Sequence, residues 1–124
     1  MHLAAHFGQT GAVRVLLNKG ADVNARSTNP MQNTPLHAAA AGRATEAARL
    51  LLEHGADVNA RQHAGWAAFH AAAQTGDLEL ARMLIEHGAD VNVRAENQQR
   101  PLDLALTKGQ QGMVEFLESH GARL

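Results

Sequence analysis

The apolar positions of this chain follow a helical period that breaks at regular intervals. From residue 70 to residue 88 the sequence reads HAAAQTG and then DLELARMLIEHG. In the second stretch Leu80, Met83 and Leu84 fall at helical spacing, so one face of the segment is apolar. The first stretch is alanine-rich and ends at Gly76, which breaks the helical pattern. This pattern predicts two short helices joined by a tight turn.

The predicted helix pair is one unit of a repeat. A glycine ends each second helix, and the segment GADVN begins at that glycine three times. The intervals between these glycines are 35, 33 and 33 residues, a period typical of stacked solenoids. Such a glycine suits the left-handed conformation after a helix C-terminus, where a β-carbon costs about 1 kcal/mol or more. We therefore predict a stack of helix pairs with left-handed turns at Gly20, Gly55, Gly88 and Gly121.

The two ends of the stack differ from its middle. Met1 aligns with Leu36, so the first unit is incomplete, while Val15 and Leu17 stay apolar where a preceding unit would cover them. Glu118 stands where the earlier units have an apolar residue. We predict a polar C-terminal cap and a poorly covered N-terminal face. Such a face is expected of a fragment of a longer array or of an end that packs against something, with a natural frayed end as the alternative.

Three stretches carry a resemblance to a known family: TPLHAAAAG at 34–42, ARLLLEHGADVNA at 48–60 and ARMLIEHGADVNV at 81–93. They resemble ankyrin repeats, which share a T-P-L-H-x-A motif and a period of about 33 residues. The resemblance covers essentially the whole chain. It implies an all-α fold, an ankyrin-repeat solenoid of stacked antiparallel helix pairs with β-hairpin fingers, in which GADVNA bends the chain from second helix to finger. The implied organisation is a single ankyrin-repeat domain, residues 1–124, with units at about 1–26, 27–61, 62–94 and 95–124.

The residues of the motif have physical roles at the start of a helix. Thr34 can cap the first helix of its unit, Pro35 suits the opening turn, and His37 can reach the backbone of a neighbouring loop. In the third unit Ala67 and Ala68 replace the Thr-Pro pair, which leaves the cap of that helix open.

Composition narrows the function further. The chain is 45% hydrophobic and 19% charged, and it has no apolar run near the length of about 20 residues that a membrane span requires. Its formal net charge of -1 lacks the positive field of a dedicated nucleic-acid binder. It has no cysteine, and its first residues, MHLAAHFGQTG, do not read as a secretory signal. We therefore expect an intracellular, cytoplasmic protein that binds neither nucleic acid nor membranes.

Histidine suggests a metal site, but the repeat explains its pattern. One set is His2, His37 and His70, and a second is His54, His87 and His120. Equivalent positions in stacked units lie about 10 Å apart, too far to share a zinc ion with bonds of about 2 Å. No nucleotide-binding, metalloprotease or serine-hydrolase motif is present. We expect no metal, no cofactor and no catalytic residues.

The family resemblance places partner contacts at the fingers and at the last turn of each first helix. A framework that repeats while its tips vary is what a recognition surface needs. We therefore predict a non-catalytic module that binds a protein or an extended peptide through its concave face. The candidate contact residues are His6, Phe7, Arg26, Asn29, Met31, Asn33, Arg61, His63, Trp66, Gln74, Thr75, Arg94, Glu96, Asn97, Gln99 and Lys108.

Three features of this surface have two interpretations each. Arg26, Arg61 and Arg94 hold the same place in successive units, so they form either a ladder for an acidic partner or a row of solvated residues. Trp66 is either an interface hot spot or a residue packed along the neighbouring finger. The finger between residues 27 and 33 has two inserted residues, which extend or distort its tip.

Two further functions remain open at this point. The chain is expected to be a monomer or to self-associate weakly through its N-terminal face. As one alternative function, it is a structural or self-associating segment of a longer repeat array. Alternatively, it is the regulatory domain of a larger enzyme.

Overall fold

The computed structural model describes residues 1–28, 30 and 32–122. The candidate contact residues Asn29 and Met31 lie outside the described residues. The helices of the described part are α1 (His2–His6), α2 (Thr10–Asn18), α3 (Pro35–Ala41), α4 (Thr45–Glu53), α5 (Ala68–Thr75), α6 (Leu78–Glu86), α7 (Pro101–Thr107) and α8 (Gln111–Ser119), with a short 3-10 turn η1 (His63–Gly65) before α5.

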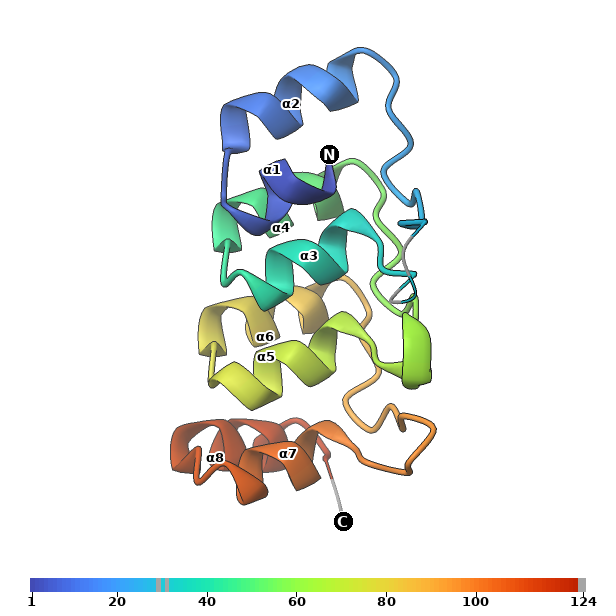
Figure 1. Ribbon diagram of the computed structural model, residues 1–124. Coiled ribbons are helices and arrows are strands. Elements are labelled where there is room, and N and C mark those ends of the chain that lie inside the picture. The colour runs from blue at the N-terminus through green and yellow to red at the C-terminus, as the bar shows by residue number, and fades with distance from the viewer. Residues whose placement is uncertain (29, 31, 123–124) are drawn as a thin grey trace.

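Helix pairs stack in layers along one direction (Figure 1). The first helices α1, α3, α5 and α7 each pack on the next, and the second helices α2, α4, α6 and α8 do the same. The loops that precede α3, α5 and α7 project together from one side of the stack (Figure 1). The expected all-α solenoid of helix pairs is therefore confirmed. None of the helices in the described ranges has the length and apolar character needed to span a membrane.

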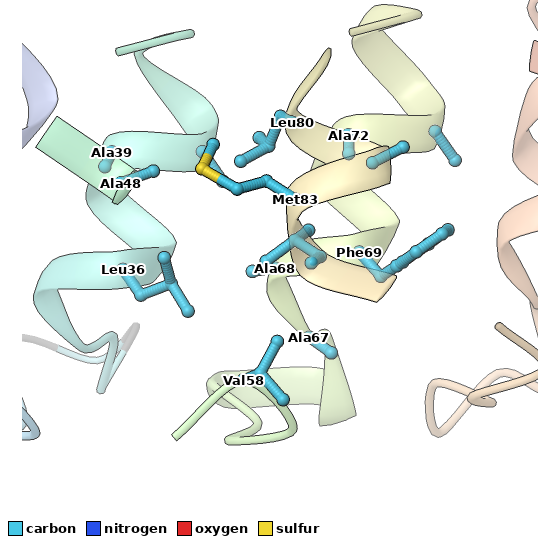
Figure 2. Packing of buried hydrophobic residues seen from close by; sticks show 14 of the residues in the cluster. Leu36, Ala39, Ala48, Val58, Ala67, Ala68, Phe69, Ala72, Leu80 and Met83 are labelled. Atoms are coloured by element: carbon cyan, nitrogen blue, oxygen red, sulfur yellow. The ribbon is translucent and has the colours of Figure 1, made fainter. Parts of the chain in front are cut away.

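Small side chains let successive layers approach closely. Ala39, Ala48 and Ala72 are completely buried, and Figure 2 shows them among larger residues such as Leu80 and Met83. A single helix pair could not bury these residues by itself, because each layer covers the apolar face of its neighbour. Stability must therefore come largely from the interfaces between units.

The repeated glycines adopt the predicted conformation. The φ angles of Gly20, Gly55, Gly88 and Gly121 are 86°, 89°, 90° and 91°, all in the left-handed region. The repeated asparagine of GADVN has a second role, linking one unit to the next. The Asn59 side chain donates to the Gly88 carbonyl (3.2 Å) and accepts from the Asp90 amide (3.0 Å). Asn24 makes the same pair of bonds one unit earlier, to Gly55 and Asp57.

The caps of the first helices follow the sequence motif. Thr34 Oγ1 accepts from the His37 amide (3.4 Å), and His37 Nδ1 accepts from the Thr34 amide (2.9 Å). Pro35 occupies the opening turn, as predicted. In the third unit only half of this arrangement is present: His70 Nδ1 accepts from the Ala67 amide (3.0 Å), but Ala67 has no side-chain acceptor.

Both sets of histidines have framework partners. His37 Nε2 donates to the Ala60 carbonyl (2.8 Å), and His70 Nε2 donates to the Gln99 carbonyl (3.0 Å), so each joins a first helix to the next finger. In the second set, His54 and His87 hydrogen-bond to the last turn of their own helices, at Leu50 and Met83. The reach of His37 to a neighbouring loop is thus confirmed.

The fingers are turns with little strand pairing. In the described part of the chain the β-structure is one isolated bridge, between Arg61 and Ala67. The Ser27 amide donates to the Asn33 carbonyl (2.8 Å), six residues on, whereas the Gln62 amide donates to a carbonyl only four residues on (2.8 Å). The hydrogen bond that closes the first of these fingers therefore spans two more residues than the one in the next finger.

The two end faces differ as the sequence suggests. Val15 is 52% exposed, whereas Leu50 and Met83, at the equivalent places of the next units, are 4% and 3% exposed. At the other end Glu118 is exposed and Leu117 beside it is buried.

Candidate partner-binding face

Two hollows lie between the fingers and the first helices. The first groove is formed by α1, α3 and the loop before α3, and its volume is about 460 Å³. The second groove is formed by α3, α5 and the loop before α5, and its volume is also about 460 Å³. Ala41, at the end of α3, lines both. The two grooves are therefore neighbours on the face formed by the first helices and the loops that precede them.

The grooves are the same place in two successive units. Their lining residues correspond at the repeat interval: His2 to His37, Ser27 to Gln62, Asn33 to Trp66, and Ala38 to Ala71. Alanine in the middle of each first helix leaves the space that forms the hollow. In α7 the corresponding residue is Leu104, which is 5% exposed and fills that place.

The walls of the second groove combine an aromatic ring with polar side chains. Trp66 is half-buried, and its ring lies against the His70 ring at 5.1 Å between centroids, tilted by 41°. Gln74 and Thr75 come from the last turn of α5, and His63 comes from η1. Trp66 therefore rests on the first helix of its own unit and presents part of its ring to the groove.

The first groove takes its aromatic wall from a helix. Phe7 is 70% exposed and Leu3 is 74% exposed, and both line this groove from the α1 side. The Phe7 ring meets the His6 ring edge-on at 4.9 Å. Asn33 lies across the groove, and its Oδ1 atom is buried without a hydrogen-bond partner in the part of the chain that the structure describes.

Close packing of α1 on α3 sets the shape of this wall. A β-carbon placed on Gly42 would lie 1.9 Å from the His6 carbonyl oxygen. Gly42 has φ −83°, an ordinary helical value, so glycine is required here by the close approach of α1. The left-handed turn that follows falls instead on Arg43, with φ 55°.

The three arginines of the predicted ladder have different surroundings. The Arg26 side chain donates to the carbonyl of Gln32 (3.1 Å) and to that of Arg61, so it braces two successive fingers. The Arg94 side chain donates to Gln98 Oε1 (3.3 Å). The Arg61 guanidinium has no hydrogen-bond or ion-pair partner among the residues that the structure describes. All three are exposed, and Arg61 is the one whose side chain is not engaged.

No arginine or lysine is among the described residues that line the two grooves. The residues that line them include no aspartate and no glutamate. Burial lowers the pKa of His37 to about 4. The hydrogen bond to Ala60 and the charge of Asp57 raise this pKa, whereas the charge of Arg26 lowers it further. Burial also lowers the pKa of His70, again with a contribution from Arg61 in the same direction. Both histidines are therefore neutral near pH 7, and the charges of Arg26 and Arg61 act on them.

The grooves bring together seven of the candidate contact residues. His6, Phe7 and Asn33 line the first groove, and the second contains His63, Trp66, Gln74 and Thr75. The candidates of the fourth unit line neither groove. Glu96 and Asn97 instead form the last finger with Gln99, where the Asn97 side chain donates to Gln99 Oε1 (2.9 Å) and accepts from the Gln99 amide (3.1 Å). Lys108 is exposed at the end of α7.

Several groove residues were absent from the sequence prediction. Leu3 lies one helical turn before Phe7, and Ala71 lies nearly one turn before Gln74, so helical spacing alone would have indicated both. Ala41 could not be predicted in this way, because an alanine in an alanine-rich helix cannot be distinguished by sequence from a core residue. Its place at the join of the two grooves follows from the packing of α3 between its neighbours.

The second helices present a polar back. Glu46, Glu53, Glu79, Glu86 and Glu115 are all exposed. Arg49 lies between Glu46 (3.6 Å) and Glu79 (3.5 Å), and such exposed pairs contribute little to stability. Within residues 1–28, 30 and 32–122, no group of three or more His, Asp or Glu side chains is arranged to bind a metal ion.

Comparison with known proteins identifies the repeat. A family model described as ankyrin repeats (3 copies) matches residues 1–62 and residues 59–124, which together span the chain. No curated protein matches the sequence significantly.

Proposed function

Because this chain belongs to the ankyrin repeat family, whose members generally bind other proteins, we propose that it is a non-catalytic binding module. Its four helix pairs act as one domain, and its partner is a protein or an extended peptide bound at the two grooves of the concave face. The proposal also places the chain inside the cell, where such a partner would meet it.

The repeated residues and the varied residues of this chain have different roles, and this difference supports the proposal. The repeated residues are engaged in the framework: His37 and Asn59, for example, each hydrogen-bond to the next unit. Other groove residues vary from unit to unit, so that Asn33 stands where the next unit has Trp66. A rigid scaffold that presents varied side chains loses little conformational entropy on association, which favours binding.

The charge at the grooves favours an acidic partner. No carboxylate lines either hollow, and Arg61, whose charge acts on His70, immediately precedes Gln62 of the second groove in sequence. A guanidinium can bind a carboxylate through two parallel hydrogen bonds. Affinity should then fall as salt is raised, because exposed charges are screened.

Selection from a displayed library of random peptides tests this function. We expect the selected peptides to lose affinity for a chain carrying both Trp66→Ala and Arg61→Ala, by about tenfold or more, since a buried tryptophan is a common hot spot. The single charge reversal Arg61→Glu should weaken binding of acidic peptides without altering the helix stack. Circular dichroism and urea unfolding would establish that each variant remains folded.

A matched control removes the same kinds of side chain elsewhere. Leu106 is 47% exposed on α7 and Arg82 is exposed on α6, and neither lines a groove. The double variant Arg82→Ala with Leu106→Ala should bind the selected peptides as the parent does. Equal losses for the two double variants would remove the groove assignment.

Self-association is a second candidate function, favoured by the exposure of Val15 on the N-terminal face. It predicts a mass that rises with concentration in sedimentation equilibrium, at low and at moderate salt. Val15→Glu should then restore the monomer. A monomeric mass throughout the concentration range would eliminate this candidate.

A further inference from the structure

We infer that the two grooves bind one segment of polyproline II conformation that has bulky apolar side chains at positions i and i+3 and an acidic residue beside the second anchor. This inference rests on the proposed function and specifies the chemistry of the partner. It follows from the number of the grooves, their spacing, the bonding groups in their walls and the charge at their edge.

The number of anchors follows from the first helices. Ala38 and Ala71 leave the floor of one groove each, whereas Leu104 occupies the same place in α7 and is buried. The stack therefore offers two equivalent hollows in succession. Each has a large aromatic side chain at its wall, the exposed Phe7 in the first and the half-buried Trp66 in the second.

The spacing of the anchors follows from the stacking of the helices. Packed helices lie about 8–10 Å apart, and the two grooves are one layer apart. A polyproline II segment has 3 residues per turn and rises about 3.1 Å per residue, so side chains at i and i+3 lie on one face about 9 Å apart. In a β-strand, side chains at i and i+3 point to opposite faces, and those at i and i+2 lie only about 7 Å apart. Polyproline II geometry therefore matches the repeat best among extended conformations.

The polar groups in the walls favour an extended backbone over a helical one. The side-chain amides of Gln62 and Gln74 line the second groove, and Asn33 lines the first. In polyproline II the peptide N–H and C=O groups make no internal hydrogen bonds and are free to pair with such amides. A helix has already paired these groups along its length, so it would leave the amides unmatched.

Charge complementarity defines the third element of the segment. Arg61 precedes Gln62 at the wall of the second groove and has no side-chain partner among the described residues. Two acidic residues lie near the second groove. The charge of Asp57 acts on His37, and the Glu96 backbone amide donates to the Ala64 carbonyl (2.9 Å). Neither makes an ion pair with Arg61. An acidic residue of the bound segment would supply one.

Alignment of peptides selected from a random library tests this inference. We expect two large apolar residues separated by two positions, with proline enriched near them and an aspartate or glutamate next to one anchor. The best peptide is then synthesised with a fluorescent label, together with versions in which the second anchor is moved by one residue in either direction. Each shift should weaken binding by about tenfold, because one side chain would leave its hollow. Peptides that bind equally well after both shifts would overturn the inference.

Two protein variants locate the binding. Ala41 is exposed and lines both grooves, so Ala41→Gln should obstruct both and weaken binding by about tenfold or more. Ala12 on α2 is also exposed and lines neither groove, so Ala12→Gln is the matched control and should change nothing.

The same variants separate the two proposals. Selected peptides that are sensitive to Ala41→Gln but carry apolar residues at the i, i+3, i+4 and i+7 positions of a helix would overturn this inference and leave the proposed function standing. Peptides insensitive to Ala41→Gln, or the absence of any enriched sequence, would overturn the proposed function itself.

Discussion

Acid should destabilise this protein through its buried histidines, and His37 shows why. This side chain is 5% exposed; its Nδ1 accepts from the Thr34 amide (2.9 Å), and its Nε2 donates to the Ala60 carbonyl (2.8 Å). Only the neutral imidazole can do both. Protonation of Nδ1 would break the bond to Thr34 and place a charge in a buried site beside Arg26, and for this reason the pKa falls to about 4 from its ordinary 6.5.

The sign and size of the effect follow from linkage. Between these two pKa values the unfolded chain binds more protons than the folded one, so stability present above the unfolded pKa is lost as pH falls towards the folded pKa. For His37 alone the loss is about 2 kcal/mol between about pH 7.5 and about pH 5, and about 3 kcal/mol when titration is complete. The pKa of His70 is also lowered by burial, so this residue adds a loss in the same direction.

Urea unfolding at a series of pH values measures this loss. The variant His37→Gln cannot titrate at this position, so its free energy of unfolding should be lower near pH 7.5 but should fall less on acidification than that of the parent. The control is His54→Gln, because His54 is exposed and its ring hydrogen-bonds to the last turn of its own helix. If His37→Gln loses as much stability between about pH 7.5 and about pH 5 as the parent does, the argument from burial is refuted.

Three further substitutions test the packing and the turns. Gly42→Ala should destabilise the chain by about 1–3 kcal/mol and expose α1 to hydrogen exchange, because its β-carbon would lie 1.9 Å from the His6 carbonyl oxygen; unchanged protection of α1 would contradict this. Ala67→Thr should raise the free energy of unfolding by about 1 kcal/mol, since Ala67 has nearly the same backbone angles as the cap residue Thr34; a neutral or negative change in urea would contradict it. Arg43→Gly should raise the free energy of unfolding by about 1 kcal/mol by removing a β-carbon from a left-handed turn, φ 55°, and a lower urea midpoint would count against it.

The features predicted best from the sequence are those set by local chemistry. The left-handed turns at Gly55 and Gly88 and the cap at Thr34 follow from the conformational preferences of single residues, and the structure has them. The helix pairs follow from apolar periodicity. The stack could then be predicted because the same helix-pair pattern recurs along the chain at a regular interval.

The features that were missed depend on contacts between units. Asn59 recurs with its glycine, yet its bonds to Gly88 and Asp90 lie in the next layer, which the periodicity of one unit does not reveal. Glycine is required at residue 42 because the backbone of α1, in another unit, lies too close for a β-carbon. Arg26 braces two fingers, a role that neither of its two sequence interpretations contained.

The candidate site shows the same limit. Finger and helix-end residues such as His63, Trp66 and Gln74 were predicted and do line a common groove. The grooves themselves could not be predicted from the sequence, because they form where three layers pack together. The same holds for the place of Ala41 at their join. The kind of partner residue that fits the grooves depends on their shape and charge. It can therefore be proposed only once the structure is known.

A nuclear magnetic resonance titration of the labelled chain with the best selected peptide shows which residues of the protein contact the peptide. We expect the amide shifts to concentrate at Phe7, Ala41, Trp66 and Gln74, around the two grooves, and those of Arg82 and Glu86 on the back of α6 to stay unchanged. Shifts concentrated on the second helices, with the groove residues unmoved, would contradict it.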